Sequence, residues 1–286
     1  MVGHRFVEAL CARDTAGGWQ VTILSEEADA AYDRVGLTGY TEHWDRARLA
    51  LPGNDYAGDD RVELRLASAA AASDREARSV RTADGGSVGY DALVLATGSY
   101  AFVPPVPGYD LAGCHVYRTL DDLDAIRAAA LAAAERGLHG VVIGGGLLGL
   151  EAANALRQFG LQTHIVERAP RLMNQQLDEA GGALLCRMIG ELGIDVHVDV
   201  GTDSIEAIDG ATAGLRVCLS DGIRVDAGVV IFAAGVRPRD ELARAADLDG
   251  AERGGARTDL SCVTSYPDIY AVGEVAAIEG RCYGLM

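Results

Sequence analysis

The sequence predicts an α/β protein made of two related β-turn-α-β halves, the second of which is inserted into the first. Three observations carry this prediction. A glycine-rich turn near the middle of the chain joins a short β-branched strand to a helix, and a similar order of elements occurs earlier. The chain also has 286 residues, which is enough for two separate cores. We therefore expect two units of the same general design.

The composition excludes several classes of function. Acidic residues outnumber basic ones by 42 to 25, so a nucleic-acid groove or an anionic membrane partner would meet repulsion. No apolar run is long enough for a membrane span. The six cysteines show no metal-ligand spacing, and the six histidines show no clustered pattern. We expect a cytoplasmic protein with no metal site, whose histidines are surface or structural residues.

The central glycine-rich turn is the most specific motif in the chain. A strand at residues 141–143 leads into Gly144-Gly145-Gly146-Leu147-Leu148-Gly149, and a helix over 150–159 follows. A second strand, residues 163–166, ends in Glu167, 21 residues beyond Gly146. This order is typical of a unit that binds a dinucleotide, although a glycine-rich turn in an ordinary α/β domain is the alternative.

Each part of the motif has a physical reason. Gly144 permits the tight turn, Gly146 lets a diphosphate approach the backbone, and Gly149 lets the helix pack closely on the strand. The helix N-terminus adds amide donors and a positive dipole. Glu167 would accept hydrogen bonds from a ribose hydroxyl and repel a 2′-phosphate, which favours NADH, while Arg168 beside it leaves NADPH open.

The start of the chain repeats part of this design. Residues 3–10 align with residues 149–156, matching a Gly and an Ala-Leu pair, and Met1-Val2 then take the place of Leu147-Leu148. On this alignment, the first strand and the first two glycines of the earlier copy would precede Met1. We therefore expect the first unit to lack its first strand.

Two Asp-Gly turns extend the repeat. Asp84-Gly85 is followed by an apolar strand and by Thr97-Gly98, thirteen residues after Gly85. Asp221-Gly222 is followed in the same way by Ala234-Gly235, thirteen residues after Gly222. Unrelated hairpins with Asp-Gly turns are the alternative to a duplication.

The repeat implies a domain layout. We expect a first segment at 1–111, an inserted domain at 112–236 and a return to the first domain at 237–286. Pro104 to Gly108 would form a stiff exit linker. Thr119 is the expected N-cap of an alanine-rich helix that begins the inserted domain.

Further motifs resemble those of the pyridine nucleotide-disulfide oxidoreductase-like flavoproteins, which have two dinucleotide-binding domains. The residues that carry this resemblance are Ala96-Thr97-Gly98, Ala234-Gly235-Val236-Arg237-Pro238 and the segment from Thr264 to Glu274. Within this group the sequence is most similar to the N-terminal reductase part of the NAD(P)H-dependent nitrite reductase large subunit. The features behind this finer likeness are Ser25-Glu26-Glu27, Ala31 to Val35, Val116 to Thr119 and Gly235 to Asp240.

The resemblance implies two Rossmann-like domains, with the NAD(P) domain inserted into the FAD domain and a C-terminal interface domain missing. FAD would lie at Gly3, Glu26, Arg34, Thr97, Gly98 and Glu274, with Glu26 on the adenosine ribose and Glu274 on the ribitol. NAD(P)H would lie at Gly144, Gly146, Leu147, Leu148, Gly149, Glu151, Glu167, Ala234 and Gly235, with Glu151 near the nicotinamide. The activity implied is hydride transfer from NAD(P)H to FAD.

We expect catalysis by cofactor positioning alone, because the sequence contains no plausible catalytic triad. Val35 stands where peroxidase and coenzyme A disulfide reductase relatives carry a redox cysteine. Gly39 stands where ferredoxin reductase relatives usually show a lysine. The first departure argues against peroxide or disulfide chemistry by that route, and the second favours the nitrite reductase type over the ferredoxin reductases.

The resemblance also implies an electron acceptor, either downstream iron–sulfur and siroheme domains or a separate protein. This chain alone is not expected to reduce nitrite, because it lacks the cysteine spacing for those centres. Two alternatives remain, a ferredoxin- or rubredoxin-reductase-like enzyme and a non-catalytic NAD(H)-binding fragment. A homodimer is an allowed assembly.

Overall fold

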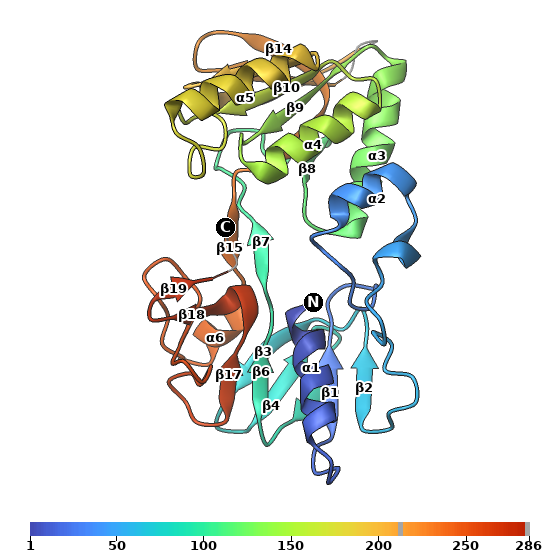
Figure 1. The fold of residues 1–286 in the computed structure, drawn as a ribbon, viewed down its shortest axis with the longest axis vertical. Helices are drawn as coiled ribbons and strands as arrows, with labels where there is room; N and C mark the ends of the chain where they lie inside the picture. Colours follow the sequence, from blue (N-terminus) through green and yellow to red (C-terminus); the bar gives the residue numbers. More distant parts are fainter. Residues whose placement is uncertain (211–213, 284–286) are drawn as a thin grey trace. The chain divides into compact units, whose positions relative to one another are not determined.

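The computed structural model describes residues 1–210 and 214–283, and the chain divides into two compact units (Figure 1). Unit 1 consists of residues 1–36, 45–100 and 237–286. Unit 2 consists of residues 37–44 and 101–236. Both units mix helices with parallel and antiparallel strands, so the α/β prediction is confirmed.

Unit 2 is built around one seven-stranded sheet. Its order is β11-β10-β9-β14-β13-β12, with β8 paired to β14. Strands β8 to β11 and β14 pair in parallel, and β12, β13 and β14 form antiparallel hairpins. The strands are β8 (Cys114–Val116), β9 (His139–Ile143), β10 (Thr163–Glu167), β11 (Ile194–Val198), β12 (Thr202–Ile208), β13 (Gly214–Leu219) and β14 (Arg224–Phe232). The helices are α2 (Leu37–His43), α3 (Leu120–Glu135), α4 (Leu147–Gln158) and α5 (Glu179–Glu191).

Helix α3 packs closely on β14, and this close packing requires small side chains such as alanine. A Cβ built on Gly228 of β14 would lie 2.3 Å from Cβ of Ala133, so the helix and strand approach closely. Thr119 is the N-cap of this helix, as predicted, and it forms a capping box with Asp122. Its hydroxyl accepts from the Asp122 amide at 3.1 Å, and the Asp122 carboxylate accepts from the Thr119 amide at 2.8 Å.

The compact units differ from the expected domain ranges at residues 37–44 and 101–111. Trp44 explains the first difference, because its ring lies 5.6 Å from Phe159 and 4.6 Å from the Arg127 guanidinium. The expected exit linker explains the second. The Ile205 amide donates to the Pro107 carbonyl at 2.8 Å, and a Cβ on Gly108 would lie 1.9 Å from the Ile205 carbonyl. The linker is therefore packed onto β12.

Unit 1 contains several small sheets rather than one large sheet. The parallel pairs are β1 (Val21–Leu24) with β2 (Val62–Arg65), and β6 (Leu93–Leu95) with β17 (Ile269–Ala271). The antiparallel set is β3 (Ala70–Asp74), β4 (Ser79–Thr82) and β5 (Ser87–Gly89), and a further sheet holds β16 (Ala256–Thr258), β18 (Ala276–Ile278) and β19 (Arg281–Cys282). Strand β7 (Ser99–Ala101) pairs with β15 (Val236–Pro238) where the chain passes between units. The helices are α1 (Val2–Arg13), α6 (Glu241–Ala245), η1 (Arg46–Leu49) and η2 (Gly273–Val275).

The backbone supports the internal repeat. Helices α1 and α4 both have 12 residues, and each carries its aligned glycine in the first turn. Gly85 and Gly222, the glycines of the two Asp-Gly turns, both have positive φ, at 90° and 87°. Gly98 and Gly235 also have positive φ. Of the helices described, none is both long and apolar enough to cross a membrane.

Three histidines that looked unrelated in the sequence form a row across unit 2. His139 Nδ1 lies 2.8 Å from His164 Nε2, and His164 Nδ1 lies 3.2 Å from His197 Nε2. The rings stack with centroids 5.1 and 5.5 Å apart. They come from β9, β10 and β11 and are hydrogen-bonded structural residues, as expected, although no pattern in the sequence indicated that they lie together. Strand register, which the sequence does not display, brings them together.

Burial, together with the neighbouring His139 and His197 rings, lowers the pKa of His164 from 6.5 to about 4. The Asp195 carboxylate, 3.6 Å away, opposes this shift. Asp226 also faces His139 and is itself paired with Arg216 at 2.7 Å. Since unfolded His164 binds a proton at higher pH than folded His164, the titration of His164 should destabilise unit 2 as the pH falls from about 6.5 towards about 4.

We predict that lowering the pH from 7 to 5 reduces the unfolding free energy by about 2 kcal/mol through His164 alone. His164→Gln removes the titrating group, so this variant should lose that part of the pH dependence. Urea unfolding of both proteins at each pH measures the difference. An equal pH dependence in the two proteins would contradict the prediction, and His43→Gln, at an exposed position, serves as the control.

Candidate functional site

The glycine turn of unit 2 lies between β9 and α4, as predicted. Gly144 has φ of 124°, and a Cβ on it would lie 2.3 Å from the Ala233 carbonyl oxygen. A Cβ on Gly149 would lie only 1.9 Å from the Gly144 carbonyl oxygen. Both positions therefore exclude any side chain. The result is that the first turn of α4 is held directly against the loop that leaves β9.

Gly146 lies on the open side of this turn. It is the N-cap of α4 with φ of −83°, and a Cβ on it would meet no atom within 4 Å. Leu147 beside it is 58% exposed, and Leu148 is half-buried. Unpaired amides and the helix dipole at such a terminus favour an anion. The backbone at Gly146 is therefore accessible to a diphosphate.

Glu167 at the end of β10 is fixed by the same turn. One carboxylate oxygen accepts from the Gly145 amide at 2.6 Å, and the other accepts from the Ala169 amide at 2.7 Å. A Cβ on Gly145 would lie 2.6 Å from Leu172, which is fully buried. Gly145 and Leu172 were not predicted as site residues. Gly145 belongs to the predicted glycine motif, whereas no motif marks Leu172, which only the packing identifies.

The remaining predicted residues of unit 2 flank this turn. The Ala234 amide nitrogen would lie 3.0 Å from a Cβ on Gly144. Gly235 has φ of 105°, and its carbonyl accepts from the Phe102 amide at 2.8 Å. Glu151 lies half-buried on α4. Burial is the main cause that raises the pKa of Tyr117 well above its ordinary value, and the Glu151 carboxylate adds to it. The two side chains therefore lie close enough to interact electrostatically.

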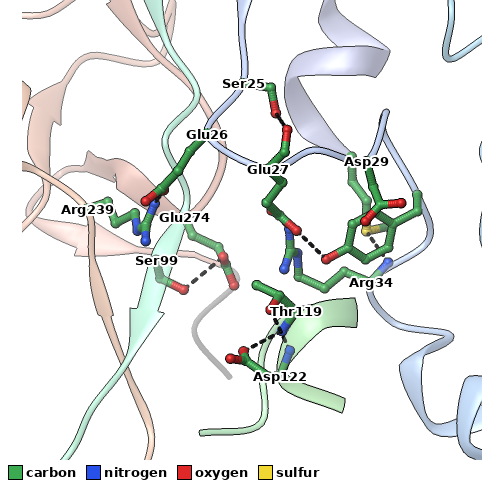
Figure 2. A network of polar contacts seen from close by, with 12 residues as sticks. Ser25, Glu26, Glu27, Asp29, Arg34, Ser99, Thr119, Asp122, Arg239 and Glu274 are labelled. Atoms are coloured by element: carbon green, nitrogen blue, oxygen red, sulfur yellow. Dashed lines mark hydrogen bonds and ion pairs between the residues drawn. The ribbon is translucent and has the colours of Figure 1, made fainter. Parts of the chain in front are cut away.

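Unit 1 brings Gly3, Gly98 and Glu274 to one place. A Cβ on Gly3 of α1 would lie 3.3 Å from Cβ of Ala96, so α1 packs closely on the strand end before Gly98. Gly98 has φ of 71°, and a Cβ on it would lie 3.6 Å from the Glu274 carboxylate. Glu274 accepts a hydrogen bond from buried Ser99 at 3.0 Å. Figure 2 shows this pair.

Two acidic residues after β1 are each paired with an arginine (Figure 2). The Arg34 guanidinium lies 2.5 Å from the Glu27 carboxylate and stacks over the Tyr32 ring at 4.8 Å. Glu26, predicted to hold a ribose, forms an ion pair with Arg239. The Glu26–Arg239 pair was not predicted. It joins positions 213 residues apart, so no local pattern could indicate it.

The chemistry of these groups fits nucleotide cofactors. Each unit has a helix N-terminus beside a glycine and an acid following the next strand, which match a diphosphate and a ribose. Among the described residues there is no group of three or more His, Cys, Asp or Glu residues that could hold a metal ion. The fold and the site together define an oxidoreductase class with two dinucleotide-binding domains.

Comparison with known proteins assigns the chain to one family within this class. Residues 5–284 match the pyridine nucleotide-disulphide oxidoreductase family, and the chain belongs to this family. It is 50% identical over all 286 residues to the nitrite reductase [NAD(P)H] large subunit of Klebsiella oxytoca, but it spans only 29% of that protein. It is 36% identical over 96% of its length to the ferredoxin–NAD(+) reductase component of an anthranilate 1,2-dioxygenase system from Burkholderia cepacia, of which it covers 66%.

A solved structure shows the same fold. A ferredoxin reductase from Rhodopseudomonas palustris matches 97% of this chain and 66% of its own, with a TM-score of 0.84 and 30% identity. The chain therefore belongs to a family of oxidoreductases, and its two-domain architecture is confirmed.

Two glycine substitutions should separate folding from nucleotide binding. Gly149→Ala places a methyl group on a backbone oxygen, so it should reduce the unfolding free energy by about 3 kcal/mol or more. Gly146→Ala meets no atom, so it should cost about 1 kcal/mol at most, yet it should weaken NADH binding at least about tenfold by obstructing the diphosphate.

Urea unfolding and calorimetric titration with NADH measure these two effects. Gly190→Ala is the matched control, because it also meets no atom but lies on α5. If Gly146→Ala bound NADH as tightly as the unsubstituted protein, the diphosphate would not lie at this turn.

Proposed function

We propose that this chain is a reductase module in which NADH gives a hydride to FAD and electrons then pass to an iron–sulfur centre. In this proposal NADH binds the domain at 112–236, and FAD binds the domain formed by 1–111 and 237–286. The observation that supports it most is the glycine turn with Glu167, where an open backbone at Gly146 lies beside an acid held by amides.

In unit 2, the proposed roles follow from the local geometry. The amides after Gly146 would hold the NADH diphosphate, with Leu147 and Leu148 covering it. Glu167 would accept hydrogen bonds from the adenosine ribose, since the Gly145 and Ala169 amides hold its carboxylate in place. Glu151 would lie at the nicotinamide end, and Gly144, Gly149, Ala234 and Gly235 would shape the backbone around the cofactor.

In unit 1, Gly3 would allow the FAD diphosphate to approach α1, and Glu26 would bind its adenosine ribose. Arg34 would contact the adenylate, Thr97 and Gly98 would line the site, and Glu274 would accept from the ribitol. Bound FAD would supply the change from two-electron to one-electron transfer. The protein side chains would position the cofactors without forming a covalent bond to substrate.

The electron acceptor is proposed from the relatives. The Klebsiella relative is a nitrite reductase and the Burkholderia relative is a ferredoxin reductase component. We favour onward transfer to iron–sulfur and siroheme domains of the nitrite reductase type over a separate ferredoxin, because sequence identity is higher to the former. A homodimer is compatible with this role, and the six free cysteines favour a reducing cytoplasmic location.

The proposed reaction has a direct test. With FAD supplied in the absence of oxygen, NADH should bleach the flavin absorption near ~450 nm much faster with the protein than without it. The Gly146→Ala variant should be slower at limiting NADH. NADH binding without any reduction of FAD would favour the nucleotide-binding fragment instead. Nitrite should not be consumed by this chain alone.

Glu167 should set the choice between the two nicotinamide cofactors. We predict that NADH binds more tightly than NADPH, and that Glu167→Gln reduces this preference about tenfold by removing the charge that opposes a 2′-phosphate. Titration of each protein with both nucleotides measures the preference, with Glu191→Gln as an exposed control on α5. An unchanged preference would place the ribose elsewhere.

A further inference from the structure

Arg239 has its backbone fixed to the cofactor-lining turn of unit 1. Its amide donates to the Gly98 carbonyl at 2.9 Å, and its carbonyl accepts from the Thr97 hydroxyl at 2.6 Å. The residues on either side, Pro238 and Asp240, are both buried, and the Asp240 carboxylate accepts from the Gly255 amide at 2.8 Å. The backbone from which the Arg239 side chain extends is therefore held in place.

The Arg239 guanidinium forms an ion pair with Glu26 (Figure 2). Arg239 thus links two parts of the proposed FAD site that are far apart in the sequence, the Thr97-Gly98 turn and the acid after β1. The two side chains are 40% and 55% exposed, and pairs this exposed contribute little to folding. A contribution to folding stability therefore does not account for the Glu26–Arg239 pair.

The acidic residues around the proposed FAD site explain why Glu26 needs a positively charged partner. FAD carries an anionic diphosphate, yet Glu26, Glu27 and Glu274 all lie in the same unit around its proposed site. Arg34 pairs with Glu27, and Arg239 pairs with Glu26. An unpaired Glu26 would both repel the cofactor and rotate freely. Because a carboxylate has two oxygens, Glu26 can keep one on Arg239 and offer the other to a ribose hydroxyl.

We propose that Arg239 is a positioning residue of the FAD site, which holds and neutralises Glu26 so that this carboxylate can bind the adenosine ribose. The inference rests on the proposed FAD site and adds a residue to it. Arg239 acts through Glu26, and no direct contact between its guanidinium and FAD is needed.

The test is titration of the full chain with FAD, followed by flavin fluorescence, for Arg239→Gln, Glu26→Gln and the double variant. Arg239→Gln should raise the Kd for FAD about tenfold, and Arg239→Lys should recover part of this loss. In the Glu26→Gln background, adding Arg239→Gln should change the Kd by less than about twofold, because the partner is already absent. Arg216→Gln is the matched control, since its pair with Asp226 has similar exposure, 38% and 47%.

Three outcomes would overturn the inference while leaving the proposed function intact. These are an unchanged Kd in Arg239→Gln, an equal loss in both backgrounds, or an equal loss in Arg216→Gln. A loss explained by unfolding is detected separately, because thermal unfolding of Arg239→Gln without FAD should match that of Arg216→Gln. If the unsubstituted protein did not bind FAD, the proposed function would fail, and this inference with it.

Discussion

The close approach of α4 to the loop after β9 is the constraint on which the candidate nucleotide site depends. A Cβ on Gly149 would lie 1.9 Å from the Gly144 carbonyl oxygen, so the helix can reach this position only without a side chain there. This contact sets the first turn of α4 beside Gly146, where the backbone is open. Glu167 then completes the arrangement, because the Gly145 amide holds one of its oxygens.

Both units have an acidic residue after the second strand of the repeat, but different groups hold its carboxylate. In unit 2 the acid that follows the second strand, Glu167, is held by the backbone amides of Gly145 and Ala169. In unit 1 the corresponding acid, Glu26, is held by the Arg239 side chain from the far end of the sequence. The acid after the second strand therefore has a similar place in both units, but different groups hold it.

Local features of the fold were predictable from the sequence, because they depend on residues a few positions apart. The glycine turn, the Thr119 cap and the Asp-Gly turns all belong to this kind. Features that depend on register between distant segments were not predictable. The row of His139, His164 and His197, the burial of Leu172 and the pair between Glu26 and Arg239 each require the tertiary structure. The packing of Trp44 onto unit 2 is a further example.

The most direct test of this account is a crystal structure of the chain with NADH bound. We expect the NADH diphosphate to lie against the backbone at Gly146 and the first amides of α4, with the adenosine ribose hydrogen-bonded to Glu167. A diphosphate bound away from this turn, or a ribose that makes no contact with Glu167, would contradict the central claim.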